Sequence, residues 1–142
     1  MERSAGARLT IALAAMVGVM VSAGGAPAAT AATPEAIGRQ RVLLVFVPSA
    51  GDPRLAAQRT ALDRAAAEAR ARDLVLVAVP EGSSDAEKLR RRFDVGRGFA
   101  VVLVGKDGTA KLRSERPVPV STLFGLIDSM PMRRQEMTRD GG

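Results

Sequence analysis

The chain contains three apolar runs and one alternating segment beyond position 40, and each of the four predicts a β-strand. The runs at residues 42–47, 74–79 and 99–104 are continuously apolar, which is typical of strands buried on both faces. Residues 109–113 instead alternate apolar and charged side chains, so this run predicts an edge strand with one face in water. The sequence therefore predicts one sheet of four strands.

Helical signals occupy the intervals between these runs. Asp52 followed by Pro53 predicts a helix start, because the carboxylate accepts from free amides and proline loses no hydrogen bond in the first turn. An Ala-rich apolar stripe continues this helix to about Arg72. A capping box formed by Ser84 and Glu87 predicts a shorter helix after the second strand.

The order of these elements predicts the fold class. The shorter helix covers residues 85–93, and a last helix at 120–130 follows the fourth strand. The result is a single α/β domain of order β-α-β-α-β-β-α, in which helices flank a four-stranded mixed sheet and the first two strands are parallel. We expect the domain to span residues 40–137, with a flexible lead-in at 29–39 and a frayed tail at 138–142.

The N-terminal segment predicts export from the cytoplasm. Arg3 and Arg8 precede an uncharged apolar run that ends in small residues shortly before Ala29. This pattern is typical of a secretory signal peptide at residues 1–28, with cleavage before Ala29. Glycines and a proline interrupt the run too early for a membrane span. We therefore expect a periplasmic or secreted protein with no transmembrane span after cleavage.

The composition excludes several kinds of chemistry. The chain contains no cysteine and no histidine, so it is not a thiol-disulfide oxidoreductase, and its stability must come from apolar packing. It has four phenylalanines but no tyrosine or tryptophan, which argues against stacking on nucleic acid bases. The aspartates show no metal-ligand spacing. The sequence favours a protein that is not an enzyme and has no cofactor or metal.

The net charge is positive and unevenly distributed. The whole chain carries +6 at pH 7; removing Arg3, Arg8 and Glu2 with residues 1–28 leaves +5. The surplus lies after position 88, where Arg90, Arg91 and Arg92 end the second predicted helix. These three cations stabilise the negative end of the helix dipole, and they are also the candidate site for an anionic surface.

Three segments of the sequence resemble a known family. They read LVGKDG at residues 103–108, KLRS at 111–114 and IDSMPMRRQEM at 127–137. With them the chain resembles a family of small exported bacterial proteins that is known only as a domain of unknown function and is grouped with thioredoxin-like folds. The resemblance implies the fold and export, but no established activity.

The chain departs from catalytic thioredoxins at both redox landmarks. Their paired cysteines lie between the first strand and the first helix, where this chain has Ser49-Ala50-Gly51-Asp52. Their cis-proline precedes the third strand, where this chain has Gly98-Phe99. Disulfide exchange therefore does not carry over to this chain.

The C-terminal string supplies the candidate binding residues. These are Asp128, Arg133, Arg134, Gln135 and Glu136, which a simple helix end does not need. One hypothesis is structural: Arg133 or Arg134 turns back over the sheet and pairs with Asp128, which docks the tail. The other is functional: the segment is a recognition surface for a protein of the cell envelope, and this is our leading hypothesis.

Two alternatives remain open from the sequence. The loop from Ser49 to Asp52 lies where α/β proteins often bind ligands, so a ligand-handling or hydrolytic enzyme is one alternative, although Ser49 has no histidine as its base. The thioethers of Met130, Met132 and Met137 make a Cu(I) binder the other. The competing structural reading is that these methionines fill gaps under the last helix.

Overall fold

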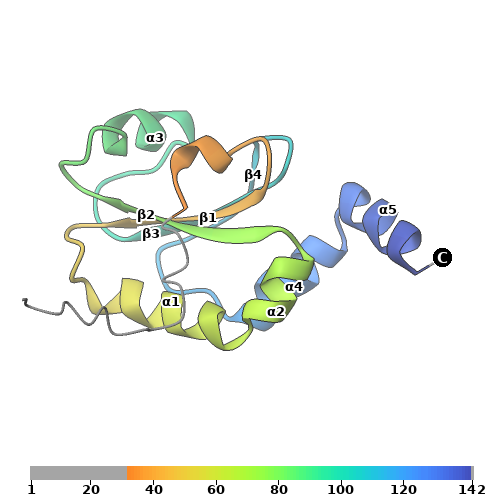
Figure 1. The fold of residues 1–142 in the computed structure, drawn as a ribbon. Coiled ribbons are helices and arrows are strands. Elements are labelled where there is room, and N and C mark those ends of the chain that lie inside the picture. Colours follow the sequence, from red (N-terminus) through yellow and green to blue (C-terminus); the bar gives the residue numbers. More distant parts are fainter. Residues whose placement is uncertain (1–31, 142) are drawn as a thin grey trace, which may run out of the picture.

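The computed structural model describes residues 32–141, and a four-stranded sheet of order β2-β1-β3-β4 lies at its centre (Figure 1). β1 is parallel to β2 and antiparallel to β3, and β3 is antiparallel to β4. The strands are β1 Arg41–Val47, β2 Leu74–Pro80, β3 Ala100–Val104 and β4 Ala110–Ser114. The predicted mixed sheet is thus confirmed, while the predicted signal peptide at residues 1–28 lies outside the described residues.

β1 is the central strand, and all seven of its residues are buried. Its apolar side chains alternate between two cores, one on each face of the sheet. The continuous apolar run that predicted this strand therefore reflects a strand covered on both sides.

Helices cover both faces of the sheet (Figure 1). One face packs against α1, α2 and α4, which contribute Leu55, Leu62, Ala69, Leu123, Phe124 and Ile127 to the core. The other face packs against α3, through Ala86 and Leu89, and against the short helix η1. The elements are η1 Pro34–Ala36, α1 Pro53–Arg64, α2 Ala66–Ala71, α3 Ala86–Arg92 and α4 Val120–Asp128.

Two helix predictions need correction. The helix expected to run to about Arg72 is interrupted at Ala65, whose φ of −112° and ψ of 32° separate α1 from α2. The prediction of a capping box formed by Ser84 and Glu87 is wrong, because α3 begins at Ala86 with no side-chain cap. The amide of Ala86 donates instead to the backbone carbonyl of Ser83, 3.1 Å away.

The edge strand β4 contains a bulge that changes which faces its side chains occupy. Leu112 pairs with Leu103, but the next pair joins Ala110 to Val104, which leaves Lys111 as an extra residue. As a result Leu112 packs against the core of one face and Ala110 against that of the other. Simple alternation along the strand would place both on one face.

Both ends of the described chain are more ordered than the sequence predicts. Where we expected a flexible lead-in, η1 forms and Ala36 and Ile37 pack against the core. Where we expected fraying beyond Met137, a further helix α5, Pro131–Asp140, continues to its end. It begins anew because Met130 is extended and Pro131 suits the first turn. Within residues 32–141, no helix combines the length and apolarity that crossing a bilayer requires.

Candidate functional site

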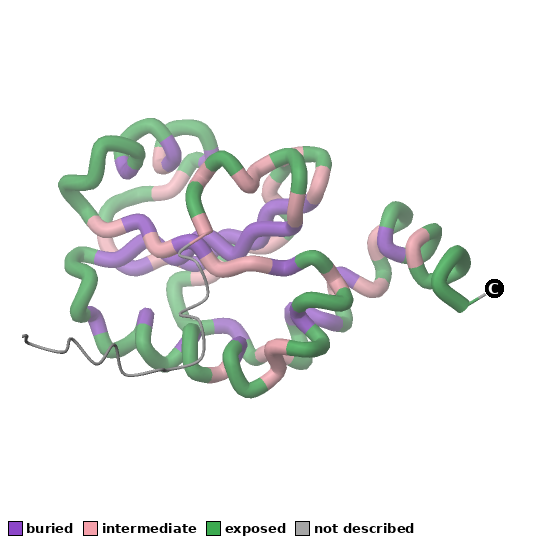
Figure 2. Tube along the Cα trace, in the orientation of Figure 1, coloured by how far each residue is buried: buried purple, intermediate pink, exposed green. Residues whose placement is uncertain are grey.

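α5 is attached to the rest of the molecule through charged side chains. Figure 2 shows it standing at one side of the fold and exposed along most of its length. Its only buried residue is Arg133, and Glu136 is half-buried. We call the charged residues beneath it the ion-pair network: Arg41, Arg72, Asp73, Lys106, Asp128, Arg133 and Glu136.

Glu136 is bound by a cation from the central strand. Arg41, the first residue of β1, is only 1% exposed. Its Nη1 donates to Glu136 Oε2 at 3.2 Å and its Nη2 to Oε1 at 3.4 Å, while Nη1 also donates to the carbonyl of Arg72 at 2.7 Å. Among the described residues its Nε has no partner. The burial of Arg41 therefore depends on the carboxylate of Glu136.

A second cation, Lys106, reaches Glu136 from the turn between β3 and β4. Its Nζ donates to Glu136 Oε1 and, at 2.8 Å, to Asp73 Oδ2. Burial disfavours charge on both partners, but the hydrogen bonds outweigh it, so the pKa of Lys106 is raised and that of Glu136 is lowered. Glu136 is therefore held as a carboxylate.

Asp128 connects two arginines at the end of α4. Arg72 binds it through Nε at 3.0 Å and Nη2 at 2.9 Å, and stacks on the ring of Phe124 with its guanidinium carbon 4.3 Å from the centroid. Arg133 Nε approaches Asp128 Oδ1 at 3.5 Å, and Arg133 Nη1 donates to the carbonyl of Ala71 at 2.9 Å. The hydrogen bond from Arg72 is the main reason that the pKa of Asp128 is lowered.

The predicted binding residues thus separate into two groups. Asp128, Arg133 and Glu136 face the body of the protein, and the predicted pairing of Arg133 with Asp128 is confirmed. Arg134 and Gln135 are exposed on α5. They line a shallow hollow together with Thr138 and Arg139.

The loop between β1 and α1 ends in a capped helix start. Asp52 Oδ1 accepts from the amide of Arg54 at 2.9 Å, and the guanidinium of Arg54 binds the same carboxylate at 3.0 and 2.7 Å. The hydrogen bond from Arg54 lowers the pKa of Asp52. Arg54 also lies over the ring of Phe99, 4.5 Å from its centroid. The predicted cap by Asp52 is confirmed. The carboxylate of Asp52 is fully engaged by Arg54, whose guanidinium also covers Phe99.

The side chains of the three arginines predicted to bind anions lie in different surroundings. Arg90 is turned inward: it donates to the carbonyls of Gly96 and Gly98, the latter at 3.0 Å, and stacks on Phe46. Arg92 lies over Phe93, 5.1 Å from its centroid. Arg91 is exposed. Arg90 therefore fixes the backbone before β3, where Gly98 has a φ of +94°.

The three methionines lie in different surroundings. Met130 packs against the core, as the structural reading of the sequence proposed. Met132 and Met137 are 49% and 39% exposed. They are five residues apart on α5, about 140° around the helix, so their thioethers project in different directions. The geometry does not support one Cu(I) site made by all three.

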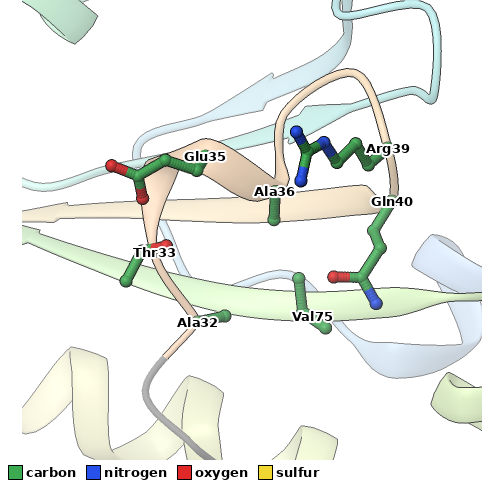
Figure 3. Close-up of a pocket in the computed structure, with 7 residues that line it drawn as sticks. All are labelled: Ala32, Thr33, Glu35, Ala36, Arg39, Gln40 and Val75. Atoms are coloured by element: carbon green, nitrogen blue, oxygen red, sulfur yellow. The ribbon is translucent and has the colours of Figure 1, made fainter.

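A second hollow lies between the N-terminal segment and the edge strand β2 (Figure 3). Ala32, Ala36 and Val75 supply its apolar surface, and its polar lining residues are Thr33, Glu35, Arg39 and Gln40. Figure 3 shows the carboxylate of Glu35 directed away from Val75. The hollow is mixed in character and holds no convergent charged cluster.

Sequence reasoning missed four members of the ion-pair network: Arg41, Arg72, Asp73 and Lys106. One signal was available, because Arg41 directly precedes an apolar run that predicts a buried strand. A charged residue in such a place needs a partner of opposite sign. The other three lie in or beside turns, where a charged residue is ordinary.

Comparisons with known proteins place the chain in a family and a fold. A family model described as "Domain of unknown function (DUF4174)" matches residues 35–136. No curated protein matches the sequence.

Three solved structures illustrate the similarity of fold. The reduced 2-Cys peroxiredoxin of Plasmodium vivax is 18% identical, with a TM-score of 0.53 over 71% of this chain and 83% of that one. Thioredoxin peroxidase I of Plasmodium yoelii is 20% identical, with a TM-score of 0.51 over 76% and 80%. The exposed lipoprotein thioredoxin of Streptococcus pneumoniae is 13% identical, with a TM-score of 0.51 over 68% and 89%. These values confirm the thioredoxin-like fold.

Proposed function

The chain belongs to the DUF4174 family, a domain of unknown function with a thioredoxin-like fold, and we propose that it is an exported binding module without catalytic activity. Its binding element is α5, and its partner is a protein of the cell envelope. Export rests on the basic and apolar pattern of residues 1–28.

One observation carries this proposal: α5 is held in place without burying an apolar face. The only buried residue of the helix is an arginine, and its two large apolar side chains, Met132 and Met137, are exposed. Ordering a residue of backbone costs about 1–2 kcal/mol, which helices usually recover by packing an apolar stripe. In α5 ion pairs offset this entropy cost. Since the helix adds no apolar face to the core, its fixed position must serve something other than core packing.

The fixed position of α5 serves to present its outer face. Because residues three apart share one side of a helix, Arg133 and Glu136 together fix the rotation of α5 as well as its position. A rigid exposed helix loses less conformational entropy on binding than a flexible tail does. The exposed pair Met132 and Met137 gives such a surface adaptable apolar contacts at its two borders.

The alternative of an enzyme at the first loop finds less support. Asp52 is committed to its cap and to Arg54, and the two hollows at α5 and beside β2 lie elsewhere. Ser49 lacks a histidine anywhere in the chain. Binding at α5 is therefore the function that the geometry supports best.

Site-specific photo-crosslinking tests this proposal in the cells that produce the protein. A photoreactive amino acid replaces Gln135 on α5, Ala50 in the first loop, or Glu115, an exposed residue after β4. We expect one discrete adduct with an envelope protein from position 135 and none from 115. Adducts from position 50 but not from 135 would contradict the proposal and favour the first loop.

A further inference from the structure

The outer face of α5 is a cationic surface of defined shape. Arg134 and Thr138 are four residues apart, as are Gln135 and Arg139, so the two pairs form adjacent rows on the helix. Together they line one hollow. The hydroxyl of Thr138 donates to the carbonyl of Arg134 at 2.9 Å, and this hydrogen bond orders the Thr138 side of the hollow. All four side chains are exposed.

The guanidinium groups on this face are exposed. Arg133, on the inner face, is consumed by Asp128, Glu136 and a backbone carbonyl. By contrast, Arg134 and Arg139 form no ion pair with any other residue in the described range 32–141. The two acids of the ion-pair network nearest in sequence, Asp128 and Glu136, are already paired with cations. Among residues 32–141, the guanidinium groups of the outer face therefore have no ion-pair partner, and the amide of Gln135 lies beside them.

Building on the proposed function, we infer that the partner of α5 presents an acidic segment, whose carboxylates bind Arg134 and Arg139. Guanidinium groups bind carboxylates through two parallel hydrogen bonds, which gives such a contact directional specificity. Gln135 lies between the two arginines and supplies a neutral amide donor, whereas the hydroxyl of Thr138 already donates to the carbonyl of Arg134.

The composition of α5 favours an acidic protein over an anionic membrane. Among its ten residues only Pro131, Met132 and Met137 are apolar, and they are dispersed around the helix. A helix that binds at a membrane surface needs a broad apolar face to enter the lipid. A protein segment needs only local apolar contacts at the borders of the charged area, which Met132 and Met137 can make.

Charge reversal with a defined probe tests this inference. The probe is a fluorescein-labelled peptide of three Glu-Glu-Leu repeats, with a Gln-Gln-Leu peptide as its neutral counterpart. Fluorescence anisotropy at low salt measures binding by the unmodified protein and by the double variant Arg134→Glu, Arg139→Glu. The matched control is Arg59→Glu, Arg70→Glu, which changes the net charge equally at exposed positions of α1 and α2.

We expect the acidic peptide to bind the unmodified protein at least about ten-fold more tightly than the α5 double variant, because both carboxylate contacts are lost. The control variant should lose less than about two-fold, since only long-range attraction changes. Equal losses in both variants would overturn the inference, because binding would then follow net charge alone. So would binding to phosphatidylglycerol vesicles without binding to the peptide.

The same variant separates this inference from the proposed function. If the crosslink from position 135 persists in the Arg134→Glu, Arg139→Glu protein, α5 remains the binding element but its partner is not acidic at these positions. If position 135 gives no crosslink even in the unmodified protein, the proposed function itself is overturned.

Discussion

Glu136 on α5 accepts hydrogen bonds from both terminal nitrogens of Arg41, a residue 95 positions earlier that is buried at the start of the central strand. This contact ties the last helix to the middle of the sheet. The two residues differ in the number of their ion-pair partners. Glu136 keeps Lys106 as a second partner, whereas Arg41 has no other carboxylate within the described part of the chain.

We therefore predict that Glu136→Gln destabilises the protein more than Arg41→Met does. The glutamine leaves a buried guanidinium without a counter-charge, which we expect to lower the free energy of unfolding by roughly 2–3 kcal/mol. Methionine fills the space of the arginine stem with an apolar chain, and Glu136 still binds Lys106, so the expected loss is about 1 kcal/mol. Urea denaturation measures both values.

The matched control for this comparison is Glu115→Gln, which removes the same charge at an exposed position. We expect it to change stability by less than about 0.5 kcal/mol. A larger loss for Arg41→Met than for Glu136→Gln would show that Arg41 stabilises the fold by packing and not by its ion pair.

Asp128→Asn should loosen α5 without unfolding the domain. The substitution removes the charge that pairs with Arg72 and Arg133, while the apolar core beneath α4 is unchanged. Limited proteolysis with trypsin is the measurement, because α5 contains three arginines. We expect cleavage after Arg133 to be several-fold faster in the variant, since local opening becomes more frequent. Equal cleavage rates would mean that Asp128 does not hold the helix.

The attachment of α5 should weaken in acid. The pKa values of Asp128 and Glu136 are both lowered by their cationic partners, so each contributes stability that is complete above its unfolded pKa of about 4. That contribution is lost as the pH falls through the lower, folded values. The groups facing them are the basic side chains of Arg41, Arg72, Lys106 and Arg133.

Urea denaturation at pH values from 6 to 2.5 measures this effect. We expect the free energy of unfolding to fall as the pH drops below about 4, and to fall less steeply in Glu136→Gln, which lacks one of the two titrating groups. If the unmodified protein and the variant show the same pH dependence, Glu136 does not contribute to it.

The strands and the fold class were predictable from the sequence because both depend on local patterns. The continuous apolar runs and the Asp52-Pro53 helix start gave the sheet and α1 correctly. The interruption at Ala65 and the bulge opposite Val104 were not predictable, because tertiary packing and register determine them. Pro131 indicated where α5 begins. The helix itself could not be predicted from hydrophobic periodicity, because it buries no apolar face.

The candidate site was harder to predict, because its charged residues pair across long separations in sequence. The high arginine content also had an unforeseen structural role: each of the four phenylalanines has a guanidinium over its ring, at 4.3–5.1 Å from the centroid. The pairs are Arg54 with Phe99, Arg72 with Phe124, Arg90 with Phe46 and Arg92 with Phe93. Arginine stacks on aromatic rings in this way more readily than lysine does.

Gln58 provides a separate test of the fold. It is buried at 1% exposure; its Nε2 donates to the carbonyl of Val118 at 3.0 Å, and its Oε1 accepts from the amide of Val118 at 2.7 Å. Gln58→Leu leaves both backbone groups unpaired, so we expect a loss of roughly 2–3 kcal/mol in thermal or urea denaturation. The neighbouring exposed substitution Arg59→Leu should be nearly neutral. Equal effects would refute the role of this hydrogen-bonded pair.

The proposed export predicts where the mature N-terminus lies. If residues 1–28 are a signal peptide, the protein recovered outside the cytoplasm should begin at Ala29. Intact mass spectrometry of the envelope and culture fractions measures this directly. A full-length chain that begins at Met1 and stays in the cytoplasm would contradict both the export and an envelope partner.

The most direct test of the account is the affinity of the crosslinked partner for the protein with α5 docked and undocked. Once the partner is identified from position 135, isothermal titration calorimetry at neutral pH compares the unmodified protein with Glu136→Gln, after circular dichroism has shown that the variant is folded. The account predicts that affinity falls at least about ten-fold in the variant, because the helix must then be ordered on binding. Unchanged affinity would contradict the claim that the ion-pair network exists to present α5.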